Sequence, residues 1–232
     1  MAYDVVAIAA HPDDAEIICG GTLVKMVKKG YQVAIVDLTR GERGTRGTPE
    51  VRADESEEAR RVMGVHHREN LAITDTEIMP TIEERNRLIA VIRRLRPRLV
   101  IAPYFEGRHP DHVQASRLVY DACFFSGLRN YPLPGEPARP HKILYALRHK
   151  EFVEPRLVID ITGEFQTKLA ALRCHRSQFP APEGTPPHGI YERVTTFAAF
   201  CGGLIGKKYA EAFYTREAVE VDDPLTLTVP SM

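Results

Sequence analysis

The sequence predicts a single α/β domain over residues 1–232, with a doubly wound, mostly parallel sheet flanked by helices. Three observations predict this fold. Short β-branched runs alternate with longer segments of helical periodicity, which is typical of βαβ units. The 232 residues are 44% hydrophobic, enough for one sizeable core. Finally, a polar His-Pro-Asp phrase comes soon after two of the apolar runs, beyond the point where each strand would end.

The expected strands are short apolar runs bounded by turn-forming or polar residues. They cover Val5–Ala9, Val33–Leu38, Asn70–Ile73, Leu99–Ala102, Ile143–Leu147 and Leu157–Ile161. A Rossmann-like sheet commonly orders its strands 3-2-1-4-5, with a crevice between the carboxyl ends of strands 1 and 4. We therefore expect the active site at the ends of the first and fourth strands.

Helices are expected between the strands, where apolar residues recur at three- and four-residue steps. They cover Asp13–Lys29, a segment marked by Ala59, Val62 and Met63, and Ile82–Leu95. Gly30 and Pro97 end the first and third of them. Tyr131–Pro140 and Phe179–Gly189 are expected to be surface loops, and the chain from Asp222 on is expected to be a strand or tail that serves subunit contacts.

Composition excludes several classes of protein. The 31 basic and 31 acidic residues cancel, so no overall field attracts nucleic acid or an anionic membrane. Nowhere do about eighteen apolar residues run without interruption, as a membrane-spanning helix requires. The four cysteines are widely spaced, which is typical of reduced, buried thiols. With a strand and no basic leader at the start, the chain is expected to be a soluble, cytoplasmic protein.

The first polar phrase reads His-Pro-Asp-Asp at residues 11–14. Pro12 suits the first turn of a helix, whose positive end keeps both following carboxylates ionised. His11 and Asp14, three residues apart across a tight turn, can converge on one cation. Asp13 then points elsewhere and is our candidate general base, which takes a proton from the attacking water.

The second phrase, His-Pro-Asp-His at residues 109–112, follows the fourth strand. A catalytic site of the zinc type uses three protein ligands and leaves a fourth position open, so His112 would complete the set with His11 and Asp14. His109 would lie beside the cation as a protonated ring and hydrogen-bond the oxyanion of a tetrahedral intermediate. Asp111 would orient and charge that ring.

Alternatives of other classes stay open at this point. Each phrase alone could be a helix N-cap, with an aspartate accepting backbone N–H bonds. The protein would then be a non-catalytic sugar- or nucleotide-binding α/β module without metal. A metallophosphoesterase would need a second cation, for which Asp13 and Glu42 are a thin supply of ligands. The interpretation we favour is a metal-dependent amidohydrolase.

With both phrases and the Ala-Glu-Ile-Ile-Cys-Gly-Gly-Thr-Leu run at residues 15–23, the chain resembles the LmbE-like (PIG-L) family of zinc-dependent N-deacetylases. The resemblance extends through the glycine-rich segment 39–47, Arg52, the helix at residues 55–63, and Tyr-Ala-Glu-Ala-Phe at residues 209–213. The resemblance implies one zinc ion per chain, with iron as an alternative in cells. It also implies the ligand, base and oxyanion roles that we inferred above from the residues of the two phrases.

The resemblance also implies a substrate, an acetamido group on a glucosamine-type sugar that is hydrolysed to amine and acetate. The chain length, the Gly-Thr-Arg-Gly loop and the Tyr-x-Glu-Ala-Phe ending resemble the bacillithiol branch, which deacetylates N-acetylglucosaminyl malate. Other N-acetylglucosamine derivatives, such as chitooligosaccharides, stay open. Relatives of this kind form homo-oligomers, often hexamers, so we expect a homo-oligomer.

Four further residues are candidate substrate contacts. Glu42 and Arg52 lie in or just after the loop that leaves the second strand, and the resemblance makes Arg52 a contact to a sugar hydroxyl. Arg108 could pair bidentately with a malate carboxylate, or be a solvated surface arginine. Tyr191 could support the intermediate, or simply pack. The remaining histidines are expected to be surface or satisfied groups, namely His66, His67, His141, His149, His175 and His188.

Overall fold

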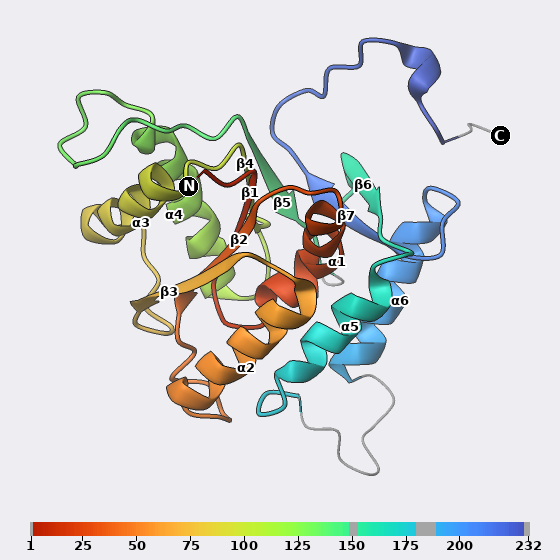
Figure 1. The fold of residues 1–232 in the computed structure, drawn as a ribbon, viewed down its shortest axis with the longest axis horizontal. Coiled ribbons are helices and arrows are strands. Elements are labelled where there is room, and N and C mark those ends of the chain that lie inside the picture. The colour runs from red at the N-terminus through yellow and green to blue at the C-terminus, as the bar shows by residue number, and fades with distance from the viewer. Residues whose placement is uncertain (1, 149–152, 180–188, 230–232) are drawn as a thin grey trace.

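A seven-stranded sheet forms the centre of the computed structural model, which describes residues 2–148, 153–179 and 189–229 (Figure 1). The strand order is β3-β2-β1-β4-β5-β7-β6. The strands are β1 (Val5–Ala9), β2 (Val33–Thr39), β3 (His67–Ile73), β4 (Leu99–Pro103), β5 (Lys142–Ala146), β6 (Leu157–Asp160) and β7 (Ala210–Tyr214). The first five are parallel, and β7 runs antiparallel to both its neighbours. The expected α/β fold and its 3-2-1-4-5 order are confirmed.

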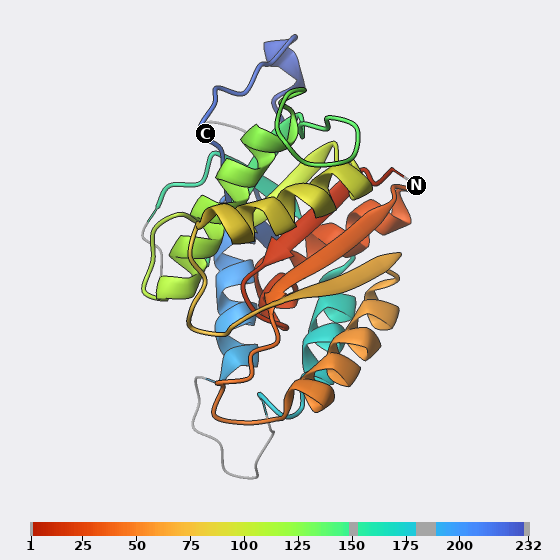
Figure 2. The same ribbon diagram turned by 90° about the vertical axis from the view of Figure 1, so that its left-hand side faces the viewer.

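Helices cover both faces of the sheet, as the two views show together (Figures 1 and 2). The α-helices are α1 (Asp14–Lys28), α2 (Pro49–Met63), α3 (Ile82–Leu95), α4 (Pro110–Ser126), α5 (Phe165–Cys174) and α6 (Ile190–Gly203). Helices α3 and α4 pack together on one face, and α5 packs against α1 and α2 on the other. Helix α6 packs against β7 and β6.

The core explains why the central strands could be predicted. Side chains of β1 alternate between two hydrophobic clusters, with Val6 and Ile8 on one face and Val5 and Ala7 on the other. All five residues of β1 and all seven of β2 are buried. Continuous apolar runs are the expected sequence of parallel strands that are covered on both faces.

The edges of the sheet differ from the expectation. Strand β3 begins at His67, three residues before the expected Asn70. The sequence pattern does not indicate this start because the first residues of the strand are polar and only partly buried. Strand β7 was not expected as a strand. Its alanines and Glu211 have low β-propensity, so only its pairing with β5 and β6 defines it.

The loop and tail expectations have mixed outcomes. Tyr131–Pro140 is a loop, as expected, whereas most of Phe179–Gly189 lies outside the described residues. After β7 the chain leaves the body as an arm that contains a short 3-10 turn, Pro224–Thr226. All four cysteines are buried and unbonded, as expected. In the described ranges, no helix is long and apolar enough to cross a membrane.

Candidate metal centre and active site

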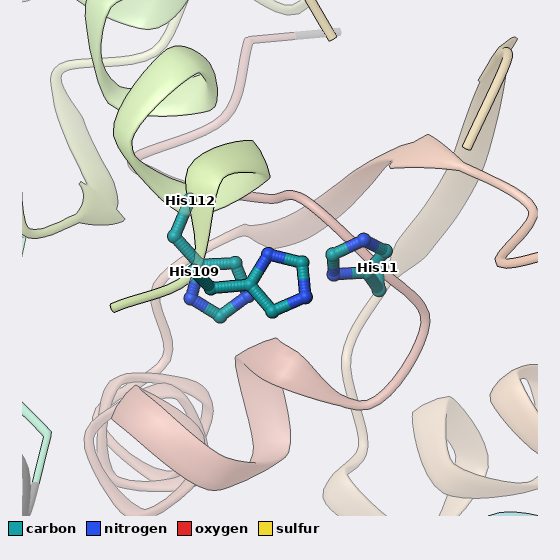
Figure 3. A group of neighbouring side chains, drawn as sticks. All are labelled: His11, His109 and His112. Atoms are coloured by element: carbon teal, nitrogen blue, oxygen red, sulfur yellow. The ribbon is translucent and has the colours of Figure 1, made fainter. Parts of the chain in front are cut away.

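The two polar phrases meet because β1 and β4 are neighbouring parallel strands. Residues 11–14 leave the carboxyl end of β1 and start α1, and residues 109–112 lie between β4 and the first turn of α4. Figure 3 shows the ring of His11 from the first phrase beside the rings of His109 and His112 from the second. Their centroids are 4.7 to 5.5 Å apart.

The three expected metal ligands converge on one carboxylate oxygen. Oδ2 of Asp14 lies 3.1 Å from Nδ1 of His11 and 3.0 Å from Nε2 of His112. Asp14 and His112 are buried, and His11 is mostly so. Two imidazole nitrogens and a carboxylate oxygen form the donor set that a zinc-type cation prefers, and a fourth position can stay open. The residues present therefore fit one divalent cation.

His109 also brings a ring nitrogen within 4.8 Å of those of His11 and His112. It differs from them in being exposed. Partial desolvation of the ring and the neighbouring rings of His112 and His11 lower the pKa of His109, so the ring is neutral near pH 7, where we expected it to be protonated. A neutral imidazole still offers one N–H donor.

Asp111 contacts His11, although we expected it to orient His109. Nε2 of His11 lies 3.1 Å from Oδ2 of Asp111 and 3.1 Å from Oδ1 of Asp75. Asp111 also accepts the backbone N–H of Thr76 at 3.1 Å. A metal-binding histidine usually donates its second ring N–H to such a carboxylate, which fixes its orientation. The two aspartates are thus placed to support His11 as a ligand.

The charge of His11 gives a testable linkage. Burial disfavours the charged ring, but hydrogen bonds to Asp111, Asp14 and Asp75 outweigh it and raise the pKa of His11 to about 12. A ligand must be neutral at the nitrogen that binds metal, so binding must release this proton. We expect affinity for zinc to rise about tenfold per pH unit between pH 6 and 8.

Calorimetric titration of the metal-free protein in two buffers with different ionisation enthalpies measures the proton released. About one proton per bound ion is expected. Equal heats in both buffers, together with an affinity that does not depend on pH, would show that metal binding takes no proton from His11.

Asp13 occupies a strained and buried position beside the donor set. Its φ of 130° lies in a region that non-glycine residues rarely adopt, and such strain concentrates at functional sites. Burial and the negative charge of Asp14 raise the pKa of Asp13 to about 7, against the opposing charges of His175 and Arg52. A carboxylate with a pKa near the working pH is suited to both accept and return a proton.

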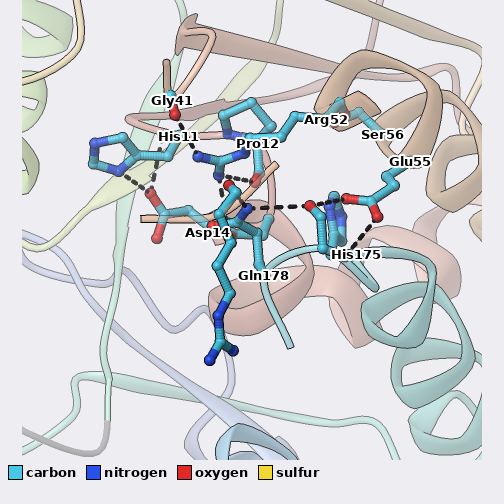
Figure 4. Close-up of polar contacts among 12 residues, drawn as sticks. His11, Pro12, Asp14, Gly41, Arg52, Glu55, Ser56, His175 and Gln178 are labelled. Carbon is cyan, nitrogen blue, oxygen red and sulfur yellow. Dashed lines mark hydrogen bonds and ion pairs between the residues drawn. The ribbon is translucent and has the colours of Figure 1, made fainter. Parts of the chain in front are cut away.

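Arg52 holds the turn that carries Asp13. Its guanidinium donates to the carbonyl oxygens of Gly41 at 2.9 Å and Pro12 at 2.8 Å (Figure 4), and lies 3.4 Å from Oδ2 of Asp13. Gly41 has a φ of 65°, and a Cβ there would overlap the Arg52 guanidinium. Arg52 is buried, and its hydrogen bonds go to the turn that carries Asp13 and to the loop at Gly41.

The other three expected substrate contacts, Glu42, Arg108 and Tyr191, have different surroundings. Glu42 is half-buried and accepts the backbone N–H of Asp75 at 2.8 Å, so it positions the loop after β3. Arg108 is exposed, directly before the second phrase. The Tyr191 hydroxyl donates to the carbonyl of Phe179 at 3.2 Å, which is a packing arrangement at the start of α6.

Sequence reasoning missed three residues near the site. Asp75 follows the polar edge strand β3, where the only signal is its place after a strand end. Nη1 of Arg148, just after β5, lies 2.5 Å from Nδ1 of His112 and 3.6 Å from Asp14. His175 was expected to be a surface or satisfied group, but it is fully buried. Its Nε2 lies 3.3 Å from Oε1 of Glu16, and neither ring nitrogen makes a hydrogen bond within the described residues.

The fold and the converging donors define an α/β protein with a candidate metal site at the ends of its parallel strands. Comparison with known protein families identifies one family within this class. The family model of PIG-L, described as GlcNAc-PI de-N-acetylase, matches residues 6–123. The chain belongs to this family.

Individual relatives agree with that assignment. A diacetylchitobiose deacetylase of Thermococcus kodakarensis is 34% identical over 226 residues, which cover 89% of this chain and 80% of the relative. A probable N-acetyl-alpha-D-glucosaminyl L-malate deacetylase of Bacillus cereus is 28% identical, over 78% of this chain and 86% of its own. The crystal structure of a conserved protein from Thermus thermophilus superposes with a TM-score of 0.87 at 38% identity, over 95% and 98% of the two chains.

Proposed function

We propose that the protein is a metal-dependent N-deacetylase, which hydrolyses the acetamido group of a glucosamine-type sugar to the amine and acetate. One observation carries the proposal: the buried carboxyl of Asp13 lies next to a donor set of two imidazoles and one carboxylate. Membership of a family described as a de-N-acetylase supports the same reaction.

The chain's own residues supply the proton transfers. When bound to His11, Asp14 and His112, a zinc-type cation would polarise the acetyl carbonyl and acidify water. Asp13, ionised, accepts the proton of the attacking water and afterwards returns a proton to the departing amine nitrogen. His109 donates its ring N–H to the oxyanion of the tetrahedral intermediate.

The role of His109 is tested by His109→Ala. We expect the variant to keep its bound metal, because Asp14 joins His11 and His112 without it. Turnover should fall about a hundredfold to a thousandfold, the usual loss when one oxyanion donor is removed. Metal analysis and acetate release on one sample measure both quantities. Unchanged turnover would remove His109 from the mechanism, and loss of metal would make it a ligand.

Two sugars compete as the natural substrate. N-acetylglucosaminyl malate suits the exposed Arg108, because a guanidinium can bind a carboxylate through two parallel hydrogen bonds. Diacetylchitobiose is the second candidate, since the relative that bears that activity is more similar to this chain, 34% identical against 28%. Acetate release from both sugars and from N-acetylglucosamine, with and without chelator, separates them.

Arg108→Ala sharpens this comparison. If Arg108 binds the malate carboxylate, the variant should lose about tenfold to a hundredfold in kcat/KM for the malate conjugate, which is the usual effect of removing a charge-assisted hydrogen bond. It should lose little in kcat/KM for N-acetylglucosamine. Arg117→Ala, another exposed arginine of the same region, is the matched control. Equal losses on both sugars would exclude a contact to malate.

The same assays address the remaining proposals. We propose zinc as the bound cation, with iron as an alternative in cells, and a cytoplasmic homo-oligomer as the working form. A sugar- or nucleotide-binding module would release no acetate. A metallophosphoesterase would bind two ions per chain and release phosphate, and Asp75 with Asp111 beside His11 makes that count worth measuring.

A further inference from the structure

The C-terminal segment of the chain exposes several large apolar side chains to solvent. The C-terminal arm, residues 217–229, leaves the body of the domain in both views (Figures 1 and 2). Its large apolar side chains all meet solvent, with Leu225 91% and Leu227 66% exposed, beside Val219, Val221 and Val229. Contiguous apolar exposure of this kind marks an interaction surface.

The base of this arm is held in place, so its direction is a property of the fold. The Arg216 guanidinium lies over the rings of Phe105 at 4.5 Å and Tyr120 at 4.6 Å. Glu217 pairs with Lys142 at 3.3 Å. Further along, the Asp223 side chain accepts the backbone N–H of Leu225 at 2.9 Å and starts the 3-10 turn that presents this leucine.

A complementary surface lies elsewhere on the same chain. We name it the α6 groove, a hollow of about 280 Å³ whose lining includes Phe200 and Leu204 of the α6 end, together with Leu147, Val153 and Pro155. Phe200 is 62% and Leu204 43% exposed, so the described part of the arm does not cover them.

Charge also matches between the two surfaces. Beyond Glu217, which pairs with Lys142, the C-terminal arm has three acidic residues, Glu220, Asp222 and Asp223, and no basic one. The exposed pair Lys207 and Lys208 comes three and four residues after Leu204, which lines the α6 groove. Complementary charges of this kind steer association and fix its register.

We propose that the C-terminal arm of one copy of this chain docks in the α6 groove of a second copy, with Leu225 and Leu227 as the apolar anchors. The acidic residues before these leucines then lie near Lys207 and Lys208 of the receiving copy. This contact would be the structural basis of the homo-oligomer, and it involves none of the residues of the metal centre.

Engineered cysteines identify the occupant of the groove. The double variant Leu225→Cys with Phe200→Cys should form a disulfide between chains, seen as a species of twice the chain mass in non-reducing electrophoresis. Because the native Cys201 also lines the groove, the single variants Leu225→Cys and Phe200→Cys are the controls, and neither should form a disulfide between chains. A disulfide within one chain would show that each arm covers its own groove, and no disulfide would show that the two surfaces do not meet. Either result overturns the proposal.

Sedimentation and mixing give an independent test. Leu225→Asp with Leu227→Asp removes the anchors, and Phe200→Asp blocks the groove. Each should weaken self-association of the protein at least about tenfold. Mixed in equal amounts, the two variants should form a one-to-one dimer, because one intact arm and one intact groove remain. Val62→Asp, on the exposed side of α2, is the control. The proposal fails if the unmodified protein is monomeric, if neither variant weakens association, or if the mixture does not pair.

Discussion

Replacing His112 with alanine should remove the bound cation and, with it, almost all deacetylation. His112 and His11 contact the same oxygen of Asp14, so the variant leaves only His11 and Asp14 of the three proposed ligands. A Lewis-acid cation stabilises the transition state by several kcal/mol, and each 1.36 kcal/mol is a factor of ten in rate. We expect turnover to fall by about three orders of magnitude or more.

Elemental analysis and acetate release on the same preparation measure this effect. The control is His141→Ala, an exposed histidine far along the sequence from both phrases. It should keep about one ion per chain and full activity. A His112→Ala protein that retains its metal and its turnover would show that the cation, if it matters, lies elsewhere.

Asp13→Asn should give the second large effect, with the opposite metal result. The amide cannot accept a proton, so turnover should fall about a hundredfold to ten-thousandfold, the usual contribution of a positioned base. The cation should stay, because Asp13 is not among the converging donors. Asp54→Asn, an exposed aspartate of α2, is the control. Full activity of Asp13→Asn would exclude it as the base.

The pH dependence follows from the same carboxyl. The pKa of Asp13 is raised to about 7 by burial and by the charge of Asp14. A cation held by Asp14 would lower this pKa, and below it the group is protonated and cannot accept a proton, so kcat/KM should rise with pH to a plateau that begins at or below about pH 7. Asp13→Asn should lack this acid limb in its residual activity, and a limb that persists there would belong to another group.

The central strands and the meeting of the two phrases could be predicted, because both depend on strong local signals. Strands β1 and β4 are buried apolar runs, and the 3-2-1-4-5 order makes them neighbours. Residues soon after the carboxyl ends of these strands therefore lie near one another, although five residues separate β4 from His109. For this reason the proximity of His11, Asp14 and His112 follows from sequence, whereas the role of each is still to be tested.

Contacts that depend on the loops could not be predicted. Asp75 is held near His11 by two hydrogen bonds, because Glu42 accepts the backbone N–H of Asp75 and the backbone N–H of Arg43 donates to the Asp75 carboxylate. That same geometry draws Asp111 to His11 and not to His109. His175 is buried against Glu16 by the packing of α5 on α1, and nothing in its local sequence marks it. The antiparallel β7 likewise depends on its partners β5 and β6.

The most direct measurement is anomalous X-ray diffraction at the zinc edge, from crystals grown without chelator. One peak per chain is expected, within about 2.0–2.2 Å of a ring nitrogen of His11, a carboxylate oxygen of Asp14 and a ring nitrogen of His112. Asp13 should lie close by without binding the ion. A peak elsewhere, or one bound by His109 in place of Asp14, would contradict the assignment of ligands and base.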